Sequence, residues 1–254
     1  MLELVTIPCL SDNYAFLLHD AKSGKTALID APESAPIEAE LAKRGWSLSE
    51  IWLTHHHWDH IDGVADLVAT TNARVVGADA DKHRLPPLDQ ALVPGASYDF
   101  AGHTVEVLDV PGHTIGHIAL YVPAANAAFT GDSLMAMGCG RLFEGRPEQM
   151  WDSLQRLSKL PPDTLICSGH EYTAGNISFA ITIEPENDAL RARREQVETA
   201  RAERRPTVPS LLSDELETNP FLRAHLSSVK AALHMKTATD ADVFAEIRAR
   251  KDDF

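Results

Sequence analysis

A histidine-rich stretch, residues 54–60 (Thr-His-His-His-Trp-Asp-His), limits what this chain can fold into more than any other feature. It directly follows the apolar run Ile51-Trp52-Leu53, which is typical of a buried strand. Alternate side chains of an extended backbone point to the same side, so His55 and His57 can reach one metal ion while His56 points away. Taken alone, the stretch could also be a tract that binds metal only adventitiously.

Three later motifs make an accidental tract a poor explanation. Each places a His or Asp beside a glycine just after an apolar, strand-like run: residues 111–114 (Pro-Gly-His-Thr), 130–133 (Thr-Gly-Asp-Ser) and 167–171 (Cys-Ser-Gly-His-Glu). Loops that end strands gather at one edge of a layered α/β fold, where sites tend to lie. We therefore expect two ions. The first would be bound by His55, His57 and His113, the second by Asp59, His60 and His170, and Asp132 would bridge them.

The donor types favour catalysis over a structural role. Structural zinc sites are closed and usually rich in cysteine, whereas these motifs offer imidazole and carboxylate. Two divalent ions, with Asp59, Asp132 and a hydroxide bound, keep a net charge of about +1, which suits a developing oxyanion. Such a pair lowers the pKa of a shared water and polarises a carbonyl. Zinc is our first expectation, although iron and manganese accept the same donors.

The remaining pattern predicts an α/β fold. Short strand-like runs and helices alternate to about residue 171, which indicates two packed sheets with helices outside. We expect a helix over 147–159 and a loop over 79–94. From residue 172 to 254 no clear strand is found, and we expect a small all-helical domain. Its helix over 188–205 carries many arginines among glutamates, which is typical of a solvated face.

Net charge and cysteine usage restrict the partners and the cellular compartment that we expect. A formal net charge of −14 argues against nucleic acid or an anionic membrane as the main partner. No secretory leader or membrane-spanning run is evident, so we expect a cytoplasmic protein, and a monomer. The three cysteines lack zinc-site spacing and are expected to be reduced thiols.

The motifs in this order resemble the metallo-β-lactamase superfamily, whose signature is T-H-x-H-x-D-H. Within it, the chain is similar to glyoxalase II, the hydroxyacylglutathione hydrolases, over nearly its whole length. The stretches that carry this second resemblance are 11–14, 111–117, 131–134, 138–145, 169–173, 206–210, 219–223 and 248–252. The resemblance implies a metallo-β-lactamase-like αββα sandwich over 1–171 and a helical substrate-binding domain over 172–254.

The resemblance also implies an activity. A hydroxide held by two metal ions would hydrolyse S-(2-hydroxyacyl)glutathione, typically S-D-lactoylglutathione, to D-lactate and glutathione, as in methylglyoxal detoxification. Asp59 and Asp132 would then be catalytic as well as ligands. Five residues match the family's glutathione contacts: Arg141, Phe143, Tyr172, Arg248 and Lys251. Some members have Lys and Tyr in place of Arg141 and Phe143, and Phe143 has no hydroxyl to donate.

Two other functions fit parts of the pattern. A mononuclear iron dioxygenase acting on glutathione persulfide, or another hydrolase of this fold, would share the signature. A metal-binding scaffold without activity would also share it, although the complete donor set disfavours that reading. The helical region after Tyr172 favours the thioester hydrolase.

Overall fold

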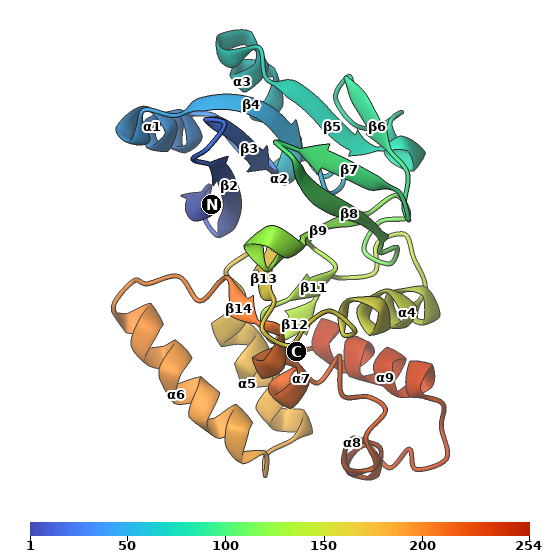
Figure 1. Ribbon diagram of the computed structural model, residues 1–254. Helices are drawn as coiled ribbons and strands as arrows, with labels where there is room; N and C mark the ends of the chain where they lie inside the picture. The colour runs from blue at the N-terminus through green and yellow to red at the C-terminus, as the bar shows by residue number, and fades with distance from the viewer. The chain divides into compact units, whose positions relative to one another are not determined.

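The computed structural model describes all residues, 1–254, and divides into two compact units (Figure 1). Unit 1 comprises Met1–Asp109 and Gly116–Gly131, and unit 2 comprises Val110–Ile115 and Asp132–Phe254. Because the chain passes between the units more than once, their limits do not coincide with a single cut in the sequence. No helix is long and apolar enough to cross a bilayer.

The first sheet of unit 1 has six strands in chain order: β1 (Leu2–Cys9), β2 (Asn13–Asp20), β3 (Lys25–Ile29), β4 (Ser47–Trp52), β5 (Arg74–Ala78) and β6 (Gln90–Leu92). The first three are antiparallel, and β3 to β6 are parallel. β2 is buried at every position, as expected for a strand packed on both faces. The parallel arrangement aims the ends of β3 and β4, which carry Asp30 and Thr54, in the same direction.

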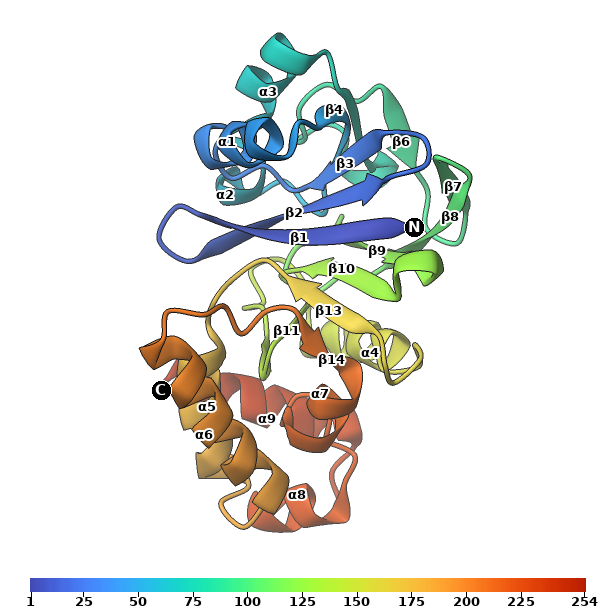
Figure 2. The same ribbon diagram turned by 60° about the vertical axis from the view of Figure 1, so that its left-hand side comes forward.

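Helices cover one face of this sheet, as Figure 2 shows. They are α1 (Ala35–Arg44), α2 (Trp58–Ile61) and α3 (Val64–Thr71), followed by the 3-10 turn η1 (Asp79–Asp81). α1 has a proline in its first turn and ends at Gly45 in the left-handed conformation, so its ends have the expected signals. Its buried residues Ile37 and Leu41 join a core that includes Ile51 of β4.

A second, antiparallel sheet of unit 1 packs against the first. It contains β7 (Ser97–Phe100), β8 (His103–Asp109), β9 (Ile118–Val122) and β10 (Ala127–Gly131), with the 3-10 turn η2 (Pro123–Ala125) between the last two. Phe16 of the first sheet lies 5.8 Å from Phe129 of the second, and Trp52 lies 5.1 Å from Phe100, measured between ring centroids. The two-sheet sandwich expected from the sequence is therefore confirmed.

Unit 2 is mainly helical. Its strands are β11 (Leu134–Met135), β12 (Gly138–Cys139), β13 (Leu165–Ser168) and β14 (Ser210–Leu211). Its helices are α4 (Pro147–Leu157), α5 (Thr173–Ile183), α6 (Asp188–Ala202), α7 (Leu212–Thr218), α8 (Ser227–Ala232) and α9 (Asp240–Asp252). α4 packs on α9 through Trp151 and Phe244, whose rings are 6.0 Å apart, and α5 and α6 share the apolar cluster of Ile177, Leu190 and Val197.

The structure departs from the expected elements in three places. The loop expected over 79–94 contains η1 and β6, and the helical region after residue 172 contains the two-residue strand β14. The solvated face expected for the helix over 188–205 is wrong at Arg193, which is only 8% exposed. Arg193 forms an ion pair with the fully buried Glu215, a partner distant in sequence that local charge spacing cannot reveal.

Candidate metal centre

In unit 1 the end of β4 delivers four of the expected metal ligands within one turn. The buried run through Leu53 continues to His55, and the half-buried His57 is the N-terminal cap of α2, which begins directly after it. His55 Nε2 lies 3.2 Å from His57 Nδ1. Asp59 and His60 follow within α2, and the carboxylate Oδ2 of Asp59 lies 4.0 Å from His60 Nε2.

The carboxylate of Asp30, which the sequence did not single out, fixes this turn by hydrogen bonds. Asp30 follows β3 in the left-handed region at φ 56° and is 3% exposed. It accepts hydrogen bonds from the Thr54 backbone N (2.9 Å) and Oγ1 (2.8 Å), and its Oδ2 lies 2.8 Å from His60 Nδ1. The only signal in the sequence is a lone Asp at the end of an apolar strand.

These contacts assign the protons on two of the rings. A carboxylate only accepts, so His60 Nδ1 carries the proton that it shares with Asp30, and the lone pair of the neutral ring is on Nε2. Thr54 Oγ1 donates its one proton to Asp30, and it therefore accepts from His55 Nδ1 at 3.0 Å. The lone pair of His55 is then also on Nε2. Outer partners of this kind typically orient histidine ligands.

Two further histidines, His56 and His117, face different partners. His56 Nδ1 lies 2.9 Å from Oδ2 of the buried Asp81, whose other oxygen accepts from Arg84 Nε at 2.6 Å. His117 stacks on His55 at 4.6 Å, and its Nδ1 donates to the backbone carbonyl of Ile118. His56 thus directs its Nδ1 to Asp81, while its ring meets that of His57 edge-on at 5.0 Å.

Unit 2 gathers the other three expected ligands around one carboxylate. Asp132 follows β10, and His170 follows β13. Oδ2 of Asp132 lies 3.4 Å from His113 Nε2 and 3.3 Å from His170 Nε2. His113 Nδ1 donates to the backbone carbonyl of Arg141 at 2.8 Å, which again leaves the lone pair on Nε2.

The donor spacing fits metal ions. Zinc bound tetrahedrally by nitrogen and oxygen has bonds of about 2.0–2.1 Å, which places neighbouring donors about 3.3–3.4 Å apart. The distances from Asp132 to His113 and His170, and from His55 to His57, are 3.4, 3.3 and 3.2 Å. A carboxylate oxygen 3.4 Å and 3.3 Å from two imidazole nitrogens is also compatible with a bridging role.

A glycine-rich segment packs tightly behind the Asp132 group. Gly140, which follows the β11–β12 hairpin, lies so close that a Cβ there would be 2.0 Å from the backbone oxygen of Asp132 and 2.9 Å from His113 Nδ1. Only glycine fits this approach. The segment thereby brings the carbonyl of Arg141 to His113 and begins the loop that carries Phe143.

Three cations of unit 2 lie around a single carboxylate. Arg248 is 5% exposed, and its Nη2 donates to Asp252 Oδ1 at 2.8 Å, while Arg141 Nε lies 3.8 Å from the same oxygen. Arg248 Nη1 also donates to the backbone carbonyl of Cys139 at 3.0 Å. Burial lowers the pKa of Lys251, and repulsion by Arg248 and Arg141 lowers it further, while Asp252 opposes both. These three side chains concentrate positive charge in one place on a chain whose net charge is negative.

Two aromatic rings lie beside the metal-ligand candidates of unit 2. Tyr172 stacks on His170 with a centroid distance of 4.7 Å, and Phe143 meets His113 edge-on at 5.2 Å. Tyr172 is 43% exposed and Phe143 is 64% exposed, so both present apolar surface to solvent. The five expected glutathione contacts (Arg141, Phe143, Tyr172, Arg248 and Lys251) therefore all belong to the unit that carries Asp132.

The three cysteines are buried and unpaired. Burial raises the pKa of Cys139 to about 11 although Arg248 opposes it, and burial raises the pKa of Cys9 to about 12. Burial also raises the pKa of Cys167. Because the thiolate is the reactive form, none of these side chains is suited to act as a nucleophile or a metal ligand at neutral pH.

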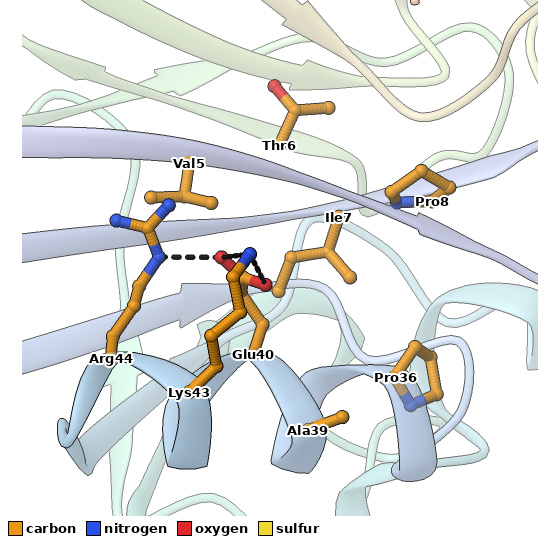
Figure 3. A pocket seen from close by; sticks show the side chains of 9 residues that line it. All are labelled: Val5, Thr6, Ile7, Pro8, Pro36, Ala39, Glu40, Lys43 and Arg44. Carbon is orange, nitrogen blue, oxygen red and sulfur yellow. Dashed lines mark hydrogen bonds and ion pairs between the residues drawn. The ribbon is translucent and has the colours of Figure 1, made fainter. Parts of the chain in front are cut away.

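A separate pocket of unit 1 lies between β1 and α1 (Figure 3). It is lined by Val5, Thr6, Ile7, Pro8, Pro36, Ala39, Glu40, Lys43 and Arg44, none of which is an expected site residue. Its one carboxylate, Glu40, pairs with Lys43 and Arg44. This pocket has neither the histidines nor the spare carboxylates of a metal site.

Comparisons with known proteins agree along the whole chain. The family model of the metallo-beta-lactamase superfamily matches residues 11–170, and that of the hydroxyacylglutathione hydrolase C-terminus matches residues 171–254. The hydroxyacylglutathione hydrolase of Ruegeria pomeroyi is 62% identical over 253 residues, covering 100% of this chain and 99% of the relative. That of Methylococcus capsulatus is 50% identical over 254 residues, with 100% and 99% covered.

Solved structures share the fold. The BLEG-1 B3 metallo-beta-lactamase aligns with a TM-score of 0.68 at 20% identity, covering 87% of this chain and 99% of its own. ETHE1 from Myxococcus xanthus aligns with a TM-score of 0.64 at 22% identity, covering 99% and 98%. The protein TTHA1623, solved in a di-iron-bound form, aligns with a TM-score of 0.57 at 29% identity, covering 66% and 91%.

Proposed function

The chain belongs to the hydroxyacylglutathione hydrolase family of the metallo-β-lactamase superfamily, and we propose from this premise how its residues hydrolyse a glutathione thioester. The reaction converts S-(2-hydroxyacyl)glutathione and water into a 2-hydroxy acid and glutathione. The observation that carries the assignment is identity of about 60% to relatives of this name over the full length, including the C-terminal region matched by its own family model. We propose S-D-lactoylglutathione as the substrate and D-lactate as the acid, which is the reaction of methylglyoxal detoxification.

We propose that the seven expected ligands form a dinuclear centre. One ion would be held by His55, His57 and His113, and the other by Asp59, His60 and His170. Asp132 would bridge them, and the similar distances from its Oδ2 to His113 Nε2 (3.4 Å) and His170 Nε2 (3.3 Å) support that role. The bound ions would supply a water of lowered pKa and a Lewis acid for the thioester carbonyl. Zinc is proposed, with iron or manganese as alternatives, because these donors suit all three.

The chain's own groups do the positioning. Asp59 and Asp132 would add negative charge to the centre, and Asp30 and Thr54 fix the tautomers of His60 and His55 so that the Nε2 lone pair of each would be available to an ion. The leaving group is a thiolate, which departs readily without a proton donor, and we assign no general acid.

Glutathione would be held away from the reacting carbonyl. Arg141, Arg248 and Lys251 supply cations for its carboxylates, and charge-assisted hydrogen bonds of this kind are the strong ones. Phe143 and Tyr172 would pack against the rest of the tripeptide, with Phe143 contributing ring surface and backbone only. We propose residues 1–171 as the catalytic domain and residues 172–254 as the substrate-binding domain.

The cellular compartment, the oligomeric state and the partners are also proposals. Three buried thiols that form no disulfide support a reducing compartment such as the cytoplasm. We propose a monomer with a small-molecule substrate, without nucleic-acid or membrane partners. The persulfide dioxygenase alternative has less support, because relatives about 60% identical over the full chain are hydroxyacylglutathione hydrolases.

The proposal is tested on one purified sample. Loss of the thioester of S-D-lactoylglutathione should proceed without oxygen uptake, and elemental analysis should find two metal ions per chain. Asp132→Ala should lower the content of both ions together, because the bridging oxygen serves each. A variant that kept both ions at full content would contradict the bridge. Oxygen uptake with glutathione persulfide, in place of thioester loss, would favour the dioxygenase.

A further inference from the structure

Asn13 holds a metal-ligand candidate at two points. It ends the turn between β1 and β2, pairs with Cys9 across that hairpin, and is 4% exposed. Its amide Nδ2 donates to the backbone carbonyl of Asp59 at 3.0 Å and to the carboxylate Oδ2 of the same residue at 3.2 Å. The two residues are 46 positions apart in sequence. The contact therefore depends on tertiary structure and was not expected from the sequence.

This double contact restricts the carboxylate of Asp59. An Asp side chain rotates broadly about its last bond and can offer either oxygen to an ion. Held at its main-chain oxygen and at Oδ2 by one amide group, Asp59 cannot turn its carboxylate without losing a hydrogen bond. Oδ2 is also the oxygen that lies 4.0 Å from His60 Nε2. Asn13 thus sets the carboxylate relative to the neighbouring donor atom.

An amide suits this position electrostatically. Its NH₂ group has two donors and no charge, so it orients the carboxylate and leaves its negative charge for a cation. A lysine would add a positive charge beside the ion. An aspartate would replace the donor by an acceptor and place a second carboxylate about 3 Å from the first. The two carboxylates would repel each other when both are ionised.

The turn that carries Asn13 is itself anchored. The backbone N of Leu10 donates to Glu33 Oε1 at 2.5 Å, and Glu33 lies on the loop that begins with Asp30. Asp30 holds Nδ1 of His60. Figure 2 shows β1 and β2 as a long hairpin with this turn at its left-hand end. The turn between β1 and β2 therefore orients Asp59, and the adjacent loop that begins with Asp30 orients His60.

We propose that Asn13 is a positioning residue for the second metal ion, acting through Asp59. The inference rests on the dinuclear centre of the proposed function and adds a residue to it. Outer partners of metal ligands typically contribute 10- to 100-fold to metal affinity. The loss of Asn13 should therefore weaken the Asp59 ion and spare the other.

The test measures metal retention and does not rely on activity. Zn²⁺-loaded wild type, Asn13→Ala, Asn13→Asp and Ser11→Ala are equilibrated with chelators of graded strength, and zinc per chain is determined. Ser11 is the matched control, because its exposed hydroxyl bonds only Asp12 within the same turn. We expect a chelator of about 10- to 100-fold lower zinc affinity to suffice for removing one ion from Asn13→Ala. Asn13→Asp should lose that ion at least as readily, and Ser11→Ala should behave as wild type.

A double-mutant cycle separates positioning from general loosening. In an Asp59→Ala background, Asn13→Ala should change zinc affinity by less than about twofold, because the carboxylate that it orients is gone. Retention of both ions by Asn13→Ala as in Ser11→Ala, or an undiminished effect in the Asp59→Ala background, would overturn the proposal. Circular dichroism of the metal-free proteins checks folding, and the near-isosteric Asn13→Asp serves if the alanine variant does not fold. A wild type that binds only one zinc would refute the dinuclear centre itself, whatever Asn13 does.

Discussion

Replacing Lys251 with methionine separates substrate binding from chemistry. Methionine keeps the apolar stem, which lies near the rings of Phe179 and Phe254, and removes the ammonium group. A hydrogen bond to a charged partner contributes about 1.5–3 kcal/mol. If Lys251 binds a glutathione carboxylate, KM should rise about 10- to 160-fold. The turnover number should change little, because this contact is remote from the reacting carbonyl.

Arg250→Met is the matched control, because it removes the same charge one residue away. Arg250 pairs with Glu246, and both side chains are well exposed at 46% and 39%, so this pair contributes little to the fold. We expect a KM within about fivefold of wild type for this variant. Steady-state kinetics with S-D-lactoylglutathione provides both constants. An unchanged KM in Lys251→Met would refute the reasoning. An equal rise in Arg250→Met would show that net charge, not a local contact, is responsible.

The pH dependence of KM tests the same contact. Burial and the neighbouring cations Arg248 and Arg141 lower the pKa of Lys251. The ammonium binds a carboxylate only while protonated, so its contribution is present at low pH and is lost as pH rises through the lowered pKa. KM should therefore rise at a pH below the range of an ordinary lysine, about 10.4. Lys251→Arg, which stays charged, should remove that rise, and a rise that persisted in this variant would point to another group.

Three further changes probe the framework. Asp30→Asn takes away an acceptor of His60 Nδ1, so zinc affinity measured by chelator competition should fall about 10- to 100-fold; unchanged affinity would mean that Asp30 does not orient the ring. Arg193→Met leaves Glu215 buried without its cation and should destabilise the fold by about 3–5 kcal/mol. The double variant with Glu215→Leu should recover part of that loss in urea unfolding, and additive losses would contradict a direct pair. The three buried thiols (Cys9, Cys139 and Cys167) should resist a thiol reagent at neutral pH until the protein unfolds, and rapid labelling of the native protein would contradict their burial.

Local pattern was sufficient to single out the candidate donors. His55 and His57 follow a short apolar strand at a spacing of two, and an extended backbone turns such side chains the same way whatever the rest of the chain does. Glycine next to Asp132 and His170 marked two more strand ends. The family resemblance added the cations of α9, because charge spacing alone indicates only a solvated helix.

Contacts between distant segments were out of reach. The burial of Arg193 depends on Glu215, which lies on another helix, and a charged residue at helical spacing looks solvated until its partner is known. The same holds for Arg248, whose guanidinium contacts the carbonyl of Cys139, 109 residues earlier in the chain. Local periodicity indicates which face of a helix or strand is apolar, but it does not identify the residues that pack against that face.

The sequence by itself therefore determined the kinds of candidate ligand, their order along the chain and the family to which the chain belongs. Only the tertiary structure decided which groups support those ligands: Asp30 behind His60, Asn13 on Asp59 and the carbonyl of Arg141 on His113. The physical reason is that a ligand is recognised by its own chemistry, whereas its support is an ordinary Asp, Asn or backbone oxygen. Such a group acquires its role only when folding brings two strand ends, or a strand end and a turn, within hydrogen-bonding distance.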